Sequence, residues 1–225
     1  MRFPSGCQVL DFLLEGGYEA GVITTIYGPA ASGKTTACMF AAIEFARKGR
    51  KVIYVDTEGG FSTERFRQLA PDYETLLSNI IFLKIGSFEE QTRQFGLLPE
   101  FAKNQKIGLV IVDTIGSHYR NARREETYRQ SNNELAMQVE ILQKLAKERA
   151  GDLLVLMTNQ VYADVEKIDE VVPVGGDIIR KRCGCMIELK AVHGSMRVAR
   201  LMSHPTISEK REVVFEIVQE GFVNR

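Results

Sequence analysis

The sequence carries no excess charge of either sign, because 29 lysine and arginine residues balance 29 aspartate and glutamate residues. A protein without an overall basic field does not attract nucleic acid as a whole, so any such contact has to come from local patches. Long apolar runs are missing as well: the N-terminus has no apolar signal core, and no run approaches the length of a membrane span. We therefore expect a soluble, cytoplasmic protein without a membrane partner.

Cysteine and histidine are scarce, with four and three residues. Cys183 and Cys185 are two positions apart, which would place both thiols on one face of a strand, but no nearby cysteine or histidine completes a zinc site. Cys7 and Cys38 stand alone in the sequence. We expect four free thiols, buried or half-buried, in a reducing compartment.

The most informative stretch is a glycine-rich loop between an expected strand, the β-branched run 22–27, and an expected helix, 37–46. All fixed positions of the G-x-x-x-x-G-K-[ST] phosphate-binding motif are filled there, by Gly28, Pro29, Ala30, Ala31, Ser32, Gly33, Lys34, Thr35 and Thr36. In this context backbone N–H groups and the helix N-terminus would surround a phosphate, Lys34 would reach the β- and γ-phosphates, and Thr35 would bind Mg²⁺. The alternative is a plain glycine turn, but the filled motif favours a nucleoside triphosphate site.

The rest of the chain alternates strand-like and helix-like segments. The run 107–113 is almost continuously apolar, as in a central parallel strand that is covered on both faces. A long polar loop is expected over 117–133, before a helix over 134–149. Further strands are expected over 51–56, 80–85 and 153–158, and a meander over 186–192, 196–202 and 212–218. The length and composition suit one α/β domain over 1–225, with a mostly parallel twisted sheet flanked by helices and a C-terminal antiparallel extension.

Polar residues at the ends of the expected strands indicate the chemistry. Asp113 ends the most apolar strand, where a carboxylate would hold the Mg²⁺ shell. Glu58 follows the second strand, and the neighbouring Gly59 and Gly60 allow the backbone to approach a phosphate closely. Gln160 follows another strand, where its amide would bond to the γ-phosphate or to the attacking water. A structural role is the alternative for each residue taken alone.

These signatures occur in the order of one family: the phosphate loop, then 54–61, 109–113 and 158–161, followed by 174–179. With them the chain resembles the ATPase core of the RecA/RadA recombinase family over nearly its whole length, and within it a short archaeal paralogue. The resemblance implies a RecA-like P-loop NTPase fold that binds ATP and Mg²⁺. It also implies that Lys34, Glu58 and Gln160 act in catalysis, with Glu58 activating water and Gln160 sensing the γ-phosphate. Thr35 and Asp113 would support the metal, and Arg65 would stack on adenine.

The same resemblance places two DNA-facing loops. The first, 119–133, carries four arginines that would contact phosphates without sequence specificity: Arg120, Arg123, Arg124 and Arg129. A solvated loop, with its charge offset by neighbouring glutamates, is the alternative. The second loop, 161–175, is acidic and is expected to repel DNA. The basic cluster beyond it consists of Arg180, Lys181 and Arg182, and Lys181 matches a basic residue that reaches the γ-phosphate of a neighbouring subunit in relatives.

The sequence therefore predicts an ATP- and DNA-binding recombinase paralogue in homologous recombination and DNA repair. We expect it to act as an accessory or mediator to the main recombinase, with weak ATP hydrolysis. Full-length relatives carry an N-terminal helix-hairpin-helix domain and a Phe-x-x-Ala linker, and we expect this chain to lack both. The expected partners are single- or double-stranded DNA, the main recombinase or other recombination proteins, and a second copy of the chain. The alternatives are an autonomous strand-exchange ATPase that forms filaments, and a signalling or clock-type ATPase without DNA.

Overall fold

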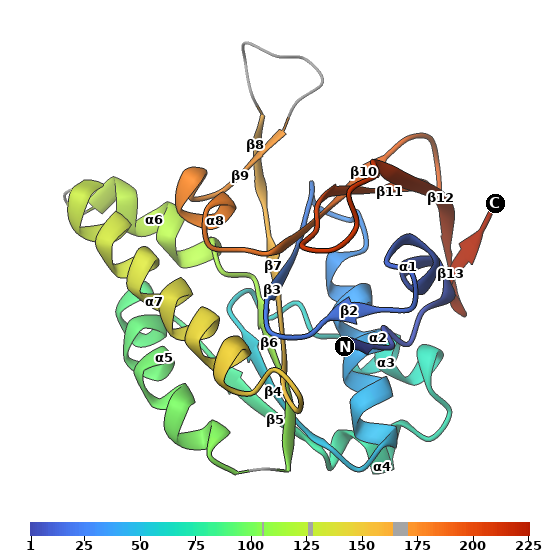
Figure 1. The fold of residues 1–225 in the computed structure, drawn as a ribbon, viewed down its shortest axis with the longest axis horizontal. Helices are drawn as coiled ribbons and strands as arrows, with labels where there is room; N and C mark the ends of the chain where they lie inside the picture. The colour runs from blue at the N-terminus through green and yellow to red at the C-terminus, as the bar shows by residue number, and fades with distance from the viewer. Residues whose placement is uncertain (105, 126–127, 164–170) are drawn as a thin grey trace.

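The computed structural model of the protein describes residues 1–104, 106–125, 128–163 and 171–225. Within these ranges the main sheet has nine strands, in the order β13-β12-β11-β10-β3-β7-β6-β4-β5 (Figure 1). Six neighbouring strands are parallel: β10 (Cys185–Ala191), β3 (Ile23–Tyr27), β7 (Leu154–Asn159), β6 (Ile107–Asp113), β4 (Lys51–Asp56) and β5 (Ile80–Lys84). The antiparallel strands are β11 (Met196–Ser203), β12 (Arg211–Val218) and β13 (Gly221–Asn224). The predicted parallel sheet with an antiparallel extension is confirmed, and β13 lengthens the expected meander.

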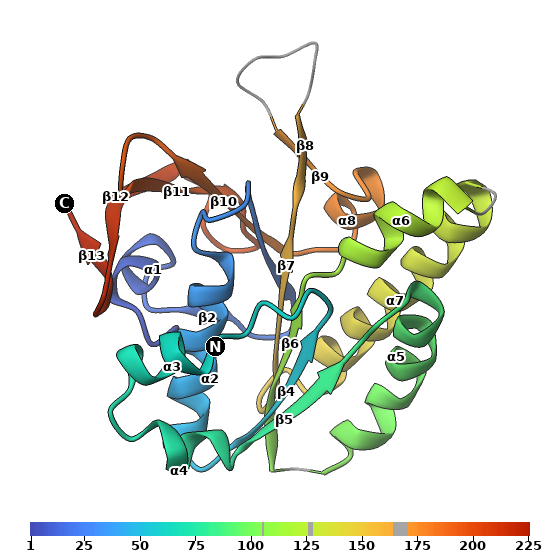
Figure 2. The same ribbon diagram turned by 180° about the vertical axis from the view of Figure 1, so that it is seen from behind.

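Helices cover both faces of the parallel part of the sheet, as Figures 1 and 2 show. Each face has its own cluster of buried apolar side chains, and all seven residues of β6 are buried between the two clusters. No helix of the described ranges combines the length and the apolar character that a bilayer crossing needs. One face carries α1 (Gln8–Leu13), α2 (Lys34–Arg47), α3 (Thr63–Leu69) and α4 (Tyr73–Leu77); the other carries α5 (Phe88–Ala102), α6 (Ser117–Glu125), α7 (Tyr128–Glu148) and α8 (Asp177–Arg180).

The polar segment that the sequence indicated as a loop is helical on both sides of residues 126–127, which lie outside the description. It forms α6 and the first turns of α7, so α7 begins six residues earlier than expected. Tyr119 explains much of the difference: its side chain is only 2% exposed, and its hydroxyl donates to Asn132 Oδ1 at 2.5 Å. Together with the buried Ala122, Tyr119 anchors a narrow apolar stripe. Tertiary packing of that stripe outweighs the polar composition of the segment.

A two-stranded antiparallel ribbon, β8 (Val161–Ala163) and β9 (Val171–Pro173), follows β7 and projects away from the helical layers (Figure 1). Its base is fixed to the sheet by two hydrogen bonds: Asn159 Nδ2 donates to Val174 O at 2.7 Å, and Val174 N donates to Gln160 O at 2.9 Å. The acidic residues 164–170, for which we expected no DNA contact, lie outside the described residues. The base of the ribbon therefore starts directly beside Gln160.

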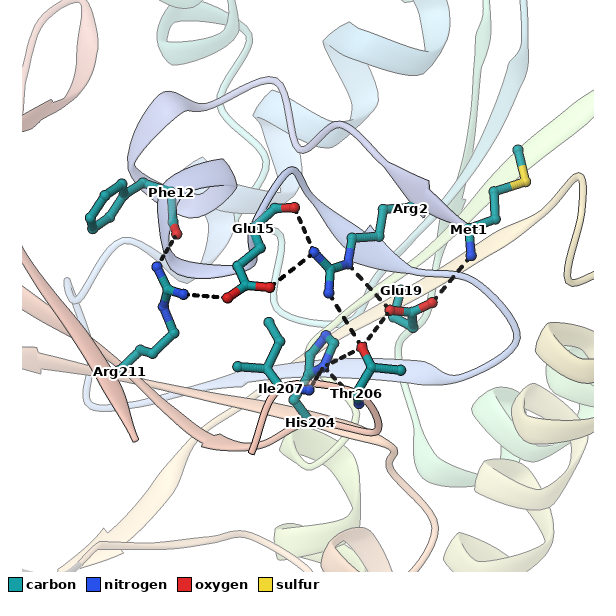
Figure 3. Close-up of polar contacts among 9 residues, drawn as sticks. All are labelled: Met1, Arg2, Phe12, Glu15, Glu19, His204, Thr206, Ile207 and Arg211. Atoms are coloured by element: carbon teal, nitrogen blue, oxygen red, sulfur yellow. Dashed lines mark hydrogen bonds and ion pairs between the residues drawn. The ribbon is translucent and has the colours of Figure 1, made fainter. Parts of the chain in front are cut away.

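The N-terminal segment, with β1 (Arg2–Phe3) and β2 (Tyr18–Glu19), is tied to the loop between β11 and β12 by charged contacts (Figure 3). Arg2 Nη1 donates to Glu15 O at 2.6 Å, and Thr206 Oγ1 donates to Glu19 Oε2 at 3.1 Å. Arg211 Nη1 pairs with Glu15 Oε1 at 2.5 Å. Each such surface pair contributes little by itself, but the pairs share partners and form one network.

All four cysteines are free and buried. Burial raises the pKa of the Cys7 and Cys183 thiols to about 11 and that of Cys185 to about 12. The expectation that Cys183 and Cys185 share one face is wrong, because Cys183 precedes β10 and joins the cluster under α5 and α7, whereas Cys185 joins the cluster under α2.

A pair of leucine substitutions tests the assignment of the core. Leu142 on α7 is fully buried, whereas Leu97 on α5 is 46% exposed. Leu142→Ala should lower the free energy of unfolding by about 3 kcal/mol, because it removes apolar contacts and leaves a cavity. Leu97→Ala, the matched control, should change it by less than about 0.5 kcal/mol. Urea unfolding followed by circular dichroism measures both values; equal losses would contradict the assignment of these two helix faces.

Candidate functional site

The phosphate loop of residues 28–36 connects β3 to α2, as the motif predicts. Gly33, the N-cap of α2, has a φ of 104°, a left-handed conformation that favours glycine. A Cβ on Gly28 would lie 2.2 Å from Leu189 O, so the backbone of the loop packs directly against β10. The loop is therefore held against the sheet while Pro29, Ala30 and Ala31 remain exposed. The free N–H groups at the start of α2 make this loop a favourable place for an anion.

The side chain of Lys34 folds over the loop from the first turn of α2. Its Nζ donates to Gly28 O at 3.0 Å and to Pro29 O at 2.7 Å, and the residue is 8% exposed. Burial lowers the pKa of Lys34, against the opposing effect of the Asp113 and Glu58 carboxylates. A cation that is poorly solvated and bonded only to neutral carbonyls is well suited to bind an incoming phosphate.

Asp113 lies at the end of β6 and is buried, with 3% of its surface exposed. Its Oδ2 accepts hydrogen bonds from Thr35 Oγ1 at 2.8 Å and from Tyr54 OH at 2.9 Å, and its Oδ1 accepts from Thr158 Oγ1 at 2.5 Å. Burial raises the pKa of Asp113, while the three hydroxyl donors act in the opposite direction. The structure thus brings the two predicted metal-binding residues, Thr35 and Asp113, into direct contact.

The sequence analysis missed the two other hydroxyl donors, Tyr54 and Thr158. A period of two along the strands would have indicated them, because alternate residues of a strand share one face. Tyr54 lies two residues before Asp56 on β4, and Asp56 is the register partner of Asp113 on β6. Thr158 is the last residue but one of β7, the neighbouring strand on the other side of β6.

Glu58 lies in the loop after β4, which the carboxylate of Asp56 holds in place. Asp56 Oδ1 accepts from the backbone N–H groups of Glu58 at 3.2 Å and of Gly60 at 3.1 Å. The side chain of Glu58 is exposed, and its Oε1 accepts from Thr114 Oγ1 at 3.0 Å and from Gln160 Nε2 at 2.6 Å. The predicted catalytic residues Glu58 and Gln160 are therefore hydrogen-bonded to each other, next to Asp113.

Arg120, predicted to face DNA, is half-buried on α6, and its Nη1 donates to Gln160 Oε1 at 3.1 Å. Arg123 and Arg124 are on the same helix, and Arg129 is exposed on α7. These four arginines therefore start from helices rather than from an open loop. The bond to Gln160 connects Arg120 with the residues of the nucleotide site.

Arg65, predicted to stack on adenine, lies in the first turn of α3, whose N-cap is Ser62. Its guanidinium donates to Val218 O and to Gln219 O, each at 2.8 Å, and to Gln68 Oε1 at 2.9 Å. The edge of the guanidinium thus joins α3 to the turn between β12 and β13. Stacking on an adenine would use the planar face instead.

The second basic cluster lies at α8. Arg180 and Lys181 are exposed, Arg182 is half-buried, and Lys181 Nζ pairs with Asp177 Oδ2 at 3.1 Å. Arg180 lines a cavity of about 500 Å³ beside β10 and β11. The cavity is also lined by Tyr27, Lys190, Arg200, Lys210 and Arg211 and by two carboxylates, Glu188 and Glu212. Arg200 pairs with Glu212 at 2.9 Å, so part of this positive charge is neutralised within the protein.

The donor set at the phosphate loop fits a magnesium–triphosphate group. A cavity of about 240 Å³ is lined by Ala31, Gly33, Lys34, Thr35, Thr36 and Ile217. Ser32 Oγ is buried beside it and has no hydrogen-bond partner among the described residues. The described residues hold no group of three His, Cys, Asp or Glu side chains that would bind a metal alone. One hydroxyl and one carboxylate suit Mg²⁺, which keeps several waters and uses substrate phosphates as ligands.

Comparison with known proteins gives four findings, from one family model, two related proteins and one solved structure. The family model described as Rad51 matches residues 1–225. The chain is 36% identical over 221 residues to the DNA repair and recombination protein RadB of Methanococcoides burtonii, covering 96% of this chain and 95% of that protein. It is 38% identical over 227 residues to RadB of Thermococcus gammatolerans, covering 96% of each.

A solved structure, described as the crystal structure of the RadB recombinase, aligns with a TM-score of 0.80 at 33% identity over 97% of both chains. The predicted RecA-like fold and the predicted resemblance to an archaeal paralogue are confirmed.

The buried carboxylate of Asp113 yields a prediction about stability and pH. The pKa of Asp113 is raised in the folded protein, so its ionisation costs stability. This cost is missing below about pH 4, which is the pKa of an aspartate in the unfolded chain. It is fully present above the pKa of Asp113 in the folded protein. Asp113→Asn should therefore raise the melting temperature by about 2–4 °C at pH 7, which corresponds to about 1 kcal/mol in the free energy of unfolding. At low pH it should give no gain.

The same variant should bind magnesium–ATP about tenfold more weakly or worse, because it removes the metal-supporting charge. Asp177→Asn, at a carboxylate that is 72% exposed, is the control and should change neither quantity. Calorimetry from pH 4 to pH 8 and nucleotide titration measure both effects. A destabilised Asp113→Asn protein at pH 7 would contradict the assigned cost.

Proposed function

The chain belongs to the Rad51 family, and we propose that it is an ATP- and DNA-binding recombinase paralogue that acts in DNA recombination and repair. One observation carries the proposal. Five polar side chains converge at the carboxyl edge of the parallel sheet, beside the phosphate loop: those of Lys34, Thr35, Asp113, Glu58 and Gln160. This is the edge at which open α/β sheets bind their ligands.

In this proposal each residue of the site has a defined task. The phosphate-loop amides and Lys34 bind the phosphates of ATP, and Thr35 and Asp113 support the Mg²⁺ shell. Mg²⁺, when bound, neutralises the charge that develops on the phosphates. Within the described part of the chain, both side-chain hydrogen bonds of Glu58 fall on Oε1, which leaves Oε2 to take the proton of an attacking water. Gln160 orients that water or bonds the γ-phosphate, and the planar face of Arg65 receives the adenine.

DNA is the second ligand in the proposal, bound through phosphates without sequence specificity. Arg120, Arg123, Arg124 and Arg129 form one candidate surface, and Arg180, Lys181 and Arg182 form the other. The zero net charge and the ion pairing of Lys181 with Asp177 favour modest affinity over tight binding. We therefore assign the chain an accessory role beside the main recombinase, with slow ATP hydrolysis. In this role it works in the cytoplasm, through its core domain.

Two substitutions separate nucleotide binding from turnover. Lys34→Ala should weaken magnesium–ATP binding about 100-fold, because it removes a charged bond to phosphate worth about 3 kcal/mol. Glu58→Gln should bind with unchanged affinity and lower kcat by about 10²–10⁴-fold, because an amide cannot take the proton. Lys48→Ala, at an exposed lysine at the end of α2, is the control. Fluorescent-nucleotide titration and phosphate release measure both quantities; full turnover in Glu58→Gln would remove its assigned role.

A salt titration tests the DNA surface of α6. Arg123→Ala/Arg124→Ala should weaken binding of a single-stranded oligonucleotide and reduce the slope of log K against log salt by about 1.4, or 0.7 for each lost phosphate contact. Arg47→Ala/Arg67→Ala, which removes two exposed arginines on the opposite face of the sheet, is the matched control. An identical slope in the α6 variant and in the wild type would exclude these contacts.

Electron microscopy with ATP and single-stranded DNA tests the alternative of autonomous strand exchange. An accessory protein should show monomers or dimers, whereas long filaments would favour the autonomous enzyme. Retention of the main recombinase on the immobilised chain in the presence of ATP would support the accessory role. Failure to bind either DNA or the recombinase would favour the signalling alternative.

A further inference from the structure

Three residues from different elements form a continuous chain of hydrogen bonds that ends at Glu58. Arg120 Nη1, on α6, donates to Gln160 Oε1 at 3.1 Å. Gln160 Nε2, between β7 and β8, donates to Glu58 Oε1 at 2.6 Å. The DNA contact proposed for Arg120 does not account for its bond to Gln160.

The chemistry of the three groups allows one orientation of the Gln160 amide. A guanidinium only donates hydrogen bonds, and a carboxylate only accepts them. The amide between Arg120 and Glu58 must therefore turn its oxygen to the arginine and its NH₂ group to the glutamate. If the guanidinium were lost, the bond to Glu58 would still favour this orientation, but the amide would lose the bond that holds its oxygen in place.

The two donors to Glu58 differ in how firmly they are held. The backbone of Thr114 is fixed by the Thr57 hydroxyl, which accepts from Thr114 N at 2.9 Å and donates to Thr114 O at 2.8 Å. Gln160 has a long, half-buried side chain that loses considerable rotamer freedom when it is ordered. Within the described part of the chain, its only other side-chain hydrogen bond is the one to Arg120.

Arg120 is itself well placed to hold the amide, because the two residues before it are fixed. The ring of His118 contacts Ile85 O at 2.9 Å through Nε2, and the buried Tyr119 bonds Asn132. The first turn of α6 is thus attached to the end of β5 and to α7, and Arg120 projects from this turn.

We propose that Arg120 is a positioning residue for the Glu58 carboxylate and acts through the Gln160 amide. It fixes the amide with its NH₂ group toward Glu58, and so fixes the carboxylate that is to take a proton from water. The inference rests on the proposed function, because it assumes that Glu58 acts in ATP hydrolysis. It makes the position of α6 a determinant of turnover.

A double-mutant cycle tests this route. Arg120→Met keeps the apolar stem of the side chain and removes its donors, and Gln160→Met removes the amide at similar size. Arg120→Met should lower kcat about tenfold and leave the magnesium–ATP affinity unchanged, as expected for loss of a residue that orients a catalytic group. In the Gln160→Met background the same change should have no further effect, because the two residues act in series. Arg120→Lys should retain most of the activity, since it keeps a donor.

Arg93→Met, at an exposed arginine of α5, is the matched control and should leave kcat unchanged. Two outcomes would overturn the proposal: wild-type kcat in Arg120→Met, or an equal tenfold loss in the presence and absence of Gln160. Melting curves establish that each variant is folded. If Arg120→Met does not fold, the cycle is run with Arg120→Ala in its place, where an equal loss in the presence and absence of Gln160 has the same overturning meaning.

A spectroscopic measurement separates failure of this inference from failure of the proposed function. The side-chain NH₂ resonances of Gln160, assigned by their loss in Gln160→Met, should shift in Arg120→Met and in Glu58→Gln, and stay unchanged in Arg93→Met. This readout needs no turnover. Absence of ATP hydrolysis in the wild type with shifted resonances would sink the proposed function alone, whereas unshifted resonances in Arg120→Met would sink the role of Arg120.

Discussion

The structure depends on a carboxylate that is buried at the edge of the sheet. Asp113 needs donors because an unpaired charge in that position would be costly, and it obtains them from Tyr54 on β4, Thr158 on β7 and Thr35 on α2. These bonds fix the ends of three strands and the first turn of a helix relative to one another. The loop after β4 and the base of the β8–β9 ribbon start from these strand ends, and the phosphate loop leads into this helix turn, so the site inherits its geometry from one buried charge.

Much of the fold and of the site followed from local patterns in the sequence. The glycine motif between a β-branched run and a helix located the phosphate loop, and the apolar run 107–113 located a strand that is covered on both faces. Glu58 and Gln160 were found because parallel strands bring their carboxyl ends to one edge. The predicted placements agree with the structure because each depended on residues that are adjacent in the chain or on a general rule of sheet topology, while the catalytic roles of Glu58 and Gln160 stay predictions.

The failures have a common physical cause, which is dependence on distant partners. The segment 117–133 is polar and lacks strong periodicity, yet residues 117–125 and 128–133 are helical because Tyr119 and Ala122 pack against the sheet and α5. The contact between Arg120 and Gln160 joins residues 40 positions apart and could not be read from either motif. Cys183 and Cys185 face different cores because the strand begins only at the second of them. A period-two rule applies only after the ends of a strand are known.

The four buried thiols have a practical consequence for work with this molecule. Disulfide exchange and alkylation proceed through the thiolate, and burial keeps these sulfurs protonated at neutral pH. A cysteine introduced at an exposed position would therefore be the one that reacts with a maleimide dye, while the native four remain silent. Fluorophores could then be attached at chosen points of the ribbon or of α6 without first replacing any native residue, leaving both cores intact.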